Sequence, residues 1–228
     1  MDLVQGLFDR LDDWRHLPSY QLERRADIFF SLYLVEALEE KFASAVHPII
    51  VPEFPVHKGS IRDGQGSNES FKIDYLAISQ ARDVAYFVEL KTDIGSRRGE
   101  QDRYLHDTAA AGLPRLLEGL KKIFAATSEK RKYLHLLRKL EELALIALPV
   151  SMDDGIKRGV TAASREIEIL SPPMRCEVVY VQPTGDGDAD INFTQFHSIV
   201  AKHTDPLSRR FAESLSAWSE RAGSTDAR

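Results

Sequence analysis

Apolar residues recur with a helical period along one long stretch near the start of the chain. The pattern runs from about Gln21 to Val46, and His47 and Pro48 end it. A shorter amphipathic segment, from Met1 to Trp14, precedes it. At 3.6 residues per turn one apolar stripe contains Ile28, Leu32, Val35, Phe42 and Val46. We therefore predict a long helix that buries this stripe.

The pattern then changes to one typical of strands. The segment from Ile49 to Val56 is rich in β-branched residues but contains two prolines, which predicts an edge strand or an extended arm. Two compact apolar runs follow, from Phe71 to Ile78 and from Val84 to Lys91. The short polar stretch between them favours an antiparallel hairpin.

The second half of the chain repeats this alternation. A helical pattern extends from Glu100 to about Leu148, with breaks near Gly112 and Thr127. Two predicted strands and two predicted helices follow, in the order Arg165–Leu170, Cys176–Val181, Phe193–His203 and Leu207–Trp218. Strands interspersed with helices in this order indicate an α/β or α+β sandwich.

Composition narrows the class of protein. The 228 residues, 43% of them hydrophobic, suit one large globular domain over 1–228, with no repeat or long linker. The single cysteine favours a reducing, cytoplasmic setting. The longest strictly apolar run, from Leu143 to Val150, is too short to span a membrane. A net charge of −5 means that any nucleic-acid partner must bind to a local basic patch.

Each strand of the predicted hairpin carries one acidic residue within an apolar run. Asp74 lies on the first strand and Glu89 on the second, so pairing can bring both carboxylates to a common edge. Lys91 follows Glu89 by two residues, and residues at i and i+2 of a strand share a face. We therefore expect two carboxylates and one ammonium group to converge there.

This combination suits hydrolysis of phosphodiester bonds. Two carboxylates with an open face suit a hard divalent ion such as Mg²⁺, which prefers oxygen ligands and keeps several waters. A lysine can help to activate water and stabilise charge that develops on a phosphate. The alternative is a cross-strand ion pair at a solvated edge, which contributes little to stability.

Asp74 on one strand, with Glu89-Leu90-Lys91 on the next after a long helix, resembles the PD-(D/E)XK nuclease superfamily. The resemblance covers about 21–117 and implies a restriction-endonuclease-like three-layer sandwich with a central mixed sheet flanked by helices. The strands and helices over 165–222 would complete it. It also implies Asp74 and Glu89 as ligands of Mg²⁺ or Mn²⁺ and Lys91 as the catalytic lysine. Ile73 stands where the family usually has proline.

Members of this family often add an acidic residue from the first helix. Glu39 falls in the middle of the predicted apolar stripe, where an unpaired carboxylate would cost several kcal/mol. We therefore expect it to meet a metal, a cation such as Lys91, or a water-filled cleft. Glu36 and Asp27 are alternatives, and Glu39 could also extend to solvent at the rim of the helix.

Two groups of basic residues are candidates for contacts with nucleic acid. Arg97, Arg98 and Arg103 follow the candidate site closely in sequence. Between Arg115 and Lys139 there are eight basic residues, Lys121 and Lys122 among them, and two acidic ones. This region would supply the basic patch, although a single run of charge is more often a solvated helix face.

The sequence therefore predicts a metal-dependent nuclease, with DNA favoured over RNA by the habit of the family alone. One alternative is a module of the same fold that binds nucleic acid or protein without cutting it. Another is a structural or regulatory protein whose acidic residues form ordinary ion pairs. A homodimer is compatible with each of these readings.

Overall fold

The computed structural model describes residues 2–61, 69–93, 99–150, 152, 164–185, 187 and 189–220. The chain forms two compact units, each assembled from segments that are separate in sequence. The first contains Met1–Val46, Glu89–Gly99 and Val179–Arg228, and the second contains His47–Val88 and Glu100–Val178. The single domain over 1–228 stays a prediction.

The strands form a five-stranded mixed sheet in the order β1-β2-β3-β6-β7. Their bounds are Val51–His57 for β1, Ser70–Ile78 for β2, Val84–Leu90 for β3, Arg175–Gln182 for β6 and Ile191–Asn192 for β7. Strands β1, β2 and β3 pair antiparallel, whereas β6 and β7 pair parallel. The predicted mixed α/β class is thus confirmed at this level.

The predicted hairpin and edge strand are both present. Strands β2 and β3 pair in a register that joins Tyr75 to Val88 and Ile78 to Ala85. Strand β1 occupies one edge of the sheet. An edge tolerates its two prolines because one side of the strand needs no ladder hydrogen bonds.

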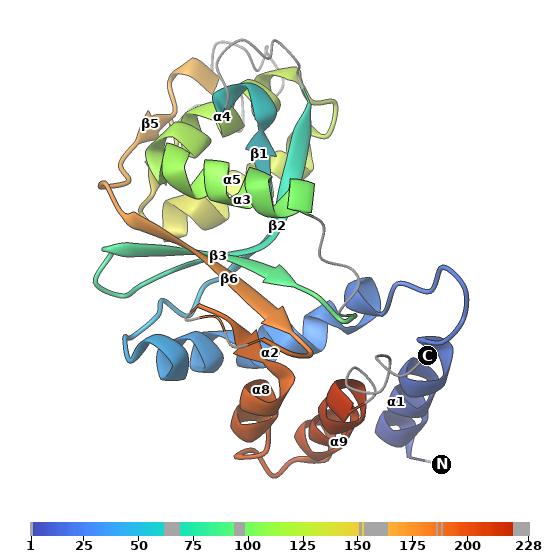
Figure 1. Cartoon of the computed structure of the whole chain (residues 1–228). Coiled ribbons are helices and arrows are strands. Elements are labelled where there is room, and N and C mark those ends of the chain that lie inside the picture. Colours follow the sequence, from blue (N-terminus) through green and yellow to red (C-terminus); the bar gives the residue numbers. More distant parts are fainter. Residues whose placement is uncertain are drawn as a thin grey trace. The chain divides into compact units, whose positions relative to one another are not determined.

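In the first unit four helices pack around an aromatic core. They are α1 (Leu3–Trp14), α2 (Leu22–Phe42), α8 (Phe193–Val200) and α9 (Pro206–Glu220), and α9 contacts both α1 and α8 (Figure 1). The ring of Phe30 lies at the centre, with centroids 5.4 Å from Phe193, 5.1 Å from Phe196 and 5.2 Å from Phe211. This cluster fixes the orientation of α2.

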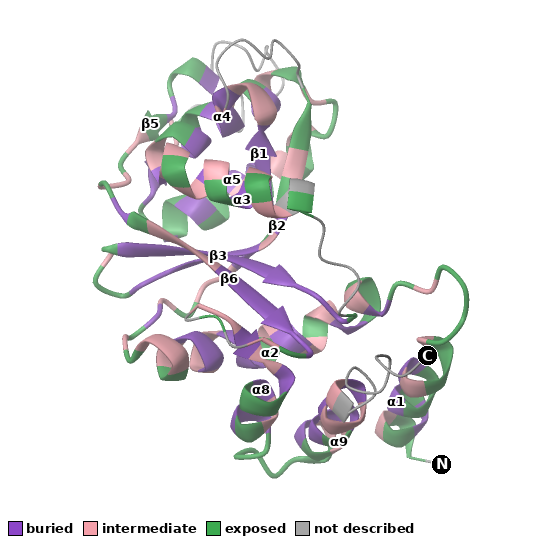
Figure 2. Ribbon diagram, in the orientation of Figure 1, coloured by how far each residue is buried: buried purple, intermediate pink, exposed green. Residues whose placement is uncertain are grey.

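The predicted buried stripe of α2 is wrong. Ile28 and Leu32 are each 60% exposed, and the buried positions lie on another face of the helix (Figure 2). The buried residues are Leu22, Ala26, Phe30, Tyr33, Leu34, Ala37 and Leu38. The helix carries apolar residues on more than one face, and the aromatic rings of α8 and α9 select the face that contains Phe30 and Tyr33.

A polar network connects α1 with α9. The carboxylate of Asp12 accepts hydrogen bonds from Arg210 at 2.6 Å, from the indole N–H of Trp218 at 2.8 Å and from the hydroxyl of Ser214 at 3.2 Å. Trp218 and Ser214 are almost fully buried. Asp12 therefore satisfies donors that would otherwise lie buried without an acceptor.

In the second unit helices α4 and α5 pack against β1 (Figure 1). The helices are α3 (Gly99–Ala111), α4 (Leu113–Ala126) and α5 (Lys130–Glu142), and a 3-10 turn over Lys58–Ser60 follows β1. A two-stranded sheet pairs β4 (Ile146–Ala147) with β5 (Glu168–Ile169). The predicted strand over Arg165–Leu170 is therefore too long, because Arg165 is still helical.

The contact between α4 and the turn after β1 is unusually close. His57 and Ser60 are buried, and Nδ1 of His57 lies 3.2 Å from Oγ of Ser60. A methyl group on Gly119 of α4 would lie 2.5 Å from that same hydroxyl oxygen. Gly119 therefore permits the helix to approach β1.

Over the described residues, no helix combines the length and the apolar character needed to cross a membrane.

Candidate active site

Glu89 and Lys91 form a buried ion pair at the end of β3. Nζ of Lys91 lies 2.7 Å from Oε1 of Glu89, and the two residues are 5% and 2% exposed. The prediction that the two side chains share a face of the strand is confirmed. Burial of both charges is costly and is offset only by close pairing and further hydrogen bonds.

The backbone holds Lys91 in place beyond the last residue of β3. The amide of Lys91 donates a 2.8 Å hydrogen bond to the carbonyl of Val181 on β6. Every residue of β3 is buried, so both faces of the strand are covered. The candidate lysine is thus fixed by a strand neighbour as well as by its own ion pair.

The structure brings an acidic residue of α2, Glu23, to this pair. Glu23 was not predicted from the sequence. Oε2 of Glu23 lies 4.0 Å from Nζ of Lys91, and the Glu23 side chain is 31% exposed. Glu23 occupies the first turn of α2. An acid there is ordinarily attributed to the helix dipole, so its position alone gave no signal. The wrong choice of buried stripe also directed attention to the far end of the helix.

Glu39, predicted as the fourth member of the site, lies far from Lys91. It is sixteen residues from Glu23 on the same helix, about 24 Å at roughly 1.5 Å per residue. Its Oε1 accepts a 3.0 Å hydrogen bond from the amide of Val46. The bond closes the turn after α2, where Ala43 adopts a left-handed conformation. Glu39 thus meets a backbone donor rather than a cation.

Glu36 and Asp27, the alternative acids of α2, differ in their distance from Glu23 along the helix. Glu36 forms exposed contacts with Lys202 at 3.5 Å and with Nε2 of His203 at 2.9 Å. Asp27 lies one turn after Glu23, on the same side of the helix. Of the acids weighed from sequence, Asp27 therefore lies nearest in the helix to Glu23.

Asp74 is half-buried on β2 in the second unit. It precedes Tyr75, which pairs with Val88, the residue before Glu89. The structure thus brings Glu89, Lys91 and Glu23 together within the first unit. The convergence of Asp74 on them stays a prediction.

The donor set of these residues consists of carboxylate oxygens and one ammonium group. Carboxylate oxygens are the ligands that Mg²⁺ and Mn²⁺ prefer, and Mg²⁺ commonly uses one or two of them together with water. Among the described residues, no group of three or more histidine, cysteine, aspartate or glutamate side chains is arranged to hold a metal. The chemistry of the carboxylates nevertheless fits a hard divalent ion.

The predicted nucleic-acid contacts are placed only in part. Arg97 and Arg98 lie outside the described residues. Arg103 is exposed on α3, and Lys122 is exposed on α4. Lys121 is half-buried and pairs with Glu118 at 3.2 Å.

Lys130 and Lys132, two lysines of the basic region between Arg115 and Lys139, bind to groups close to them in the chain. Nζ of Lys130 donates to the carbonyls of Phe124 and Ala125 at 2.6 and 2.9 Å, and so caps the end of α4. Burial lowers the pKa of Lys130. Lys132 pairs with Glu129 at 2.7 Å. The region therefore offers fewer unengaged cations than its sequence suggests.

Comparisons with protein-family models, with curated proteins and with solved structures gave no match to this chain.

Proposed function

We propose that this protein is a metal-dependent nuclease of the restriction-endonuclease-like fold, which hydrolyses phosphodiester bonds and favours DNA. One observation carries the proposal. Glu89 and Lys91 are buried as an ion pair, with the carboxylate of Glu23 4.0 Å from the same ammonium. Apolar residues of similar size would often be at least as stable there, so a catalytic role explains why the charges are present.

The pairing of β2 and β3 supports a place for Asp74 in this site. The described register ends with Tyr75 opposite Val88. An antiparallel ladder that continued by one pair would make Asp74 and Glu89 partners. We propose that these two carboxylates hold Mg²⁺ or Mn²⁺. Glu23 would not bind the ion directly.

The bound ion would supply a nucleophilic water at neutral pH and Lewis-acid stabilisation of the phosphate. Lys91 would orient this water and offset the negative charge that develops on the phosphate oxygens. Its pairing with Glu89 keeps the ammonium group in position before substrate binds. Glu23, which is partly exposed, would position Lys91 from the side of α2.

Metal binding tests the site without a choice of substrate. We would titrate the wild type, Asp74→Asn and Glu89→Gln with Mn²⁺ in a calorimeter, with Glu36→Gln as the matched control on an exposed carboxylate. The proposal predicts heat of binding in the wild type and in the control, and its loss in both site variants. Equal binding in all four proteins would place the metal elsewhere and overturn the assigned ligands.

Turnover separates the nuclease from a binding module of the same fold. Radiolabelled single- and double-stranded DNA and RNA would be incubated with Mg²⁺ and with the wild type or Lys91→Met. Cleavage by the wild type alone supports the proposed role of Lys91. Tight binding of nucleic acid without cleavage by either protein would favour the non-catalytic module instead.

A further inference from the structure

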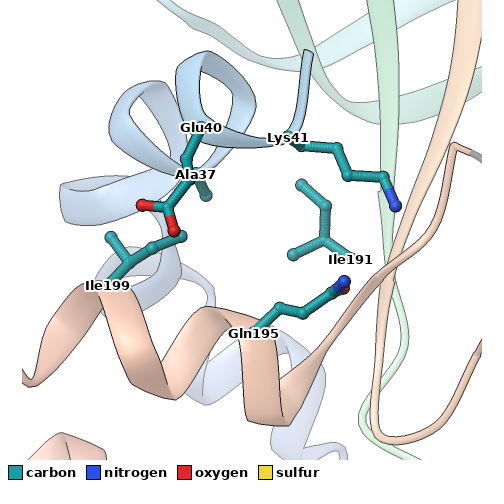
Figure 3. A pocket seen from close by; sticks show the side chains of 6 residues that line it. All are labelled: Ala37, Glu40, Lys41, Ile191, Gln195 and Ile199. Atoms are coloured by element: carbon teal, nitrogen blue, oxygen red, sulfur yellow. The ribbon is translucent and has the colours of Figure 1, made fainter. Parts of the chain in front are cut away.

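The first unit contains a pocket at the opposite end of α2 from Glu23. It is lined by residues from α2, β7 and α8, with a volume of about 290 Å³ (Figure 3). The lining residues are Ala37, Glu40, Lys41, Ile191, Gln195 and Ile199. Lys41 is eighteen residues beyond Glu23, about 27 Å along the helix at roughly 1.5 Å per residue. The pocket is therefore separate from the candidate active site.

The apolar lining comes from all three elements. Ala37, Ile191 and Ile199 contribute aliphatic groups, and each of these residues is almost fully buried. The volume lies just below the usual range for small-molecule sites, so it suits only a small ligand. Such a surface suits a short aliphatic body rather than a bare inorganic ion.

The polar residues that line the pocket are one acid, one base and one neutral amide. Figure 3 shows the Lys41 side chain and the amide of Gln195 on the same side of the pocket, with Ile191 between them. The side chain of Lys41 makes no hydrogen bond or ion pair with any described residue. The one acidic lining residue, Glu40, is engaged by Lys202. The charge left over at the pocket is therefore positive.

Gln195 is held rigidly by the start of α8. Its side-chain oxygen accepts a 3.0 Å hydrogen bond from the amide of Asn192, whose own side chain accepts from the amide of Gln195 at 2.9 Å. This capping box uses the amide oxygen. The amide nitrogen of Gln195 is thus left to donate on the side that Lys41 occupies.

From these features we infer that the pocket binds a small organic carboxylate with a short aliphatic chain. The chain would contact Ala37, Ile191 and Ile199, and the carboxylate would accept hydrogen bonds from Lys41 and Gln195. A hydrogen bond from an ammonium to a carboxylate is stronger than one between neutral groups. The inference does not depend on the proposed nuclease activity.

Hexanoate is a suitable probe of this inference. We would titrate the ¹⁵N-labelled full chain with hexanoate, with inorganic phosphate and with hexylammonium, and follow the amide resonances of Ile191, Gln195 and Ile199. The expected result is a saturable shift with hexanoate alone. A comparable response to hexylammonium would overturn the role of charge. A response to phosphate without one to hexanoate would overturn the aliphatic class.

Two variants test the polar groups. Lys41→Met keeps the aliphatic stem and removes the charge, and should weaken hexanoate binding by about tenfold. Gln195→Glu keeps an acceptor for the capping box but repels the carboxylate, so it should weaken binding at least as much. Lys139→Met changes another exposed lysine, on α5, and should leave binding unchanged.

The variants also test whether the role of Lys41 is purely structural. A lysine in the last turn of α2 favours the helix through its dipole. Were that its whole function, Lys41→Met would lower the melting temperature and leave the affinity for hexanoate at the wild-type value. That combination would overturn the inference. Weakened binding at an unchanged melting temperature supports it.

Discussion

Lys91 donates a 2.7 Å hydrogen bond from its ammonium group to Oε1 of Glu89, and both side chains are shielded from water. Such a pair is stable only while both members are present. If one charge is removed, the other stays in a medium of low polarity without its partner. The pair therefore links stability to the residues that we propose for catalysis.

This relationship predicts a non-additive pattern of stability. Lys91→Met alone should lower the free energy of unfolding by about 3–5 kcal/mol, because it leaves the Glu89 carboxylate buried. Glu89→Leu combined with Lys91→Met should recover most of that loss. Urea unfolding followed by circular dichroism measures both. A double variant less stable than the single one would show that the ion pair is not the source of the loss.

Asp12 should be essential to the docking of α1 on α9. Asp12→Ala leaves the indole N–H of Trp218 without its acceptor and removes one of the two aspartates that bind Arg210, the other being Asp9 at 3.0 Å, at a cost of about 2–3 kcal/mol. Asp13→Ala, at an exposed neighbouring position, should change stability by less than about 0.5 kcal/mol. Thermal unfolding compares the two, and equal effects would show that the network does not hold the helices together.

Gly119 should not tolerate even a methyl group. Alanine is favoured over glycine in a helix by about 1 kcal/mol, but the added carbon would overlap Oγ of Ser60 at 2.5 Å. Overpacking of this kind costs about 1–3 kcal/mol, so Gly119→Ala should be destabilising overall. Chemical denaturation in a Ser60→Gly background should show a smaller loss.

Gly99 provides the matched control for this substitution. An added methyl group there would meet no atom of the described residues within 4 Å. Gly99→Ala should therefore be neutral or slightly stabilising. If Gly119→Ala behaved in the same way, α4 and the turn after β1 would be less closely packed than the contact indicates.

His57 should make the second unit sensitive to acid. Burial, with a smaller contribution from the nearby charge of Lys122, lowers the pKa of His57 below its ordinary value of 6.5. As pH falls through 6.5, His57 becomes protonated in the unfolded chain but stays neutral in the folded chain, so the free energy of unfolding falls. The loss levels off below the lowered pKa. Well above pH 6.5 His57 is neutral in both states and no longer affects stability.

The test is the urea midpoint measured between about pH 8 and about pH 5, before most carboxylates titrate. His57→Gln should flatten the profile, and Lys122→Met should flatten it in part because it removes the repulsive charge. Wild-type and His57→Gln profiles of equal slope would assign the sensitivity to another group.

If nucleic acid binds to the second unit, Arg103 and Lys122 should contribute through phosphate contacts. Replacing either by alanine should weaken binding of duplex DNA without changing sequence preference, and should reduce the slope of log K against log salt by about 1. Lys132→Ala removes a lysine already paired with Glu129 and serves as the control. Unchanged salt slopes in both test variants would exclude this surface.

Local sequence determined much of the secondary structure. The compact apolar runs from Phe71 to Ile78 and from Val84 to Lys91 predicted a hairpin, because a short polar stretch separates them. Strand geometry predicted that Glu89 and Lys91 project to the same side, since residues at i and i+2 share a face of a strand, and the two side chains are in contact. The two prolines predicted an edge strand or an extended arm, and β1 is an edge strand.

The shortest strands could not be predicted from the local sequence. Strands β4 and β7 have two residues each, so their sequences contain no measurable period. Their neighbours in space define them: Ile146 pairs with Ile169, and Val181 pairs with Ile191. Only the folded chain can supply such partners.

The face that α2 buries was decided by tertiary structure alone. With apolar residues on more than one side, the sequence of α2 is compatible with burial of either Ile28 or Phe30, and the rings of Phe193 and Phe211 select Phe30. That choice brings Glu23 to Lys91. Periodicity thus specifies which residues share a face, whereas the partner that covers a face depends on contacts between segments far apart in the chain.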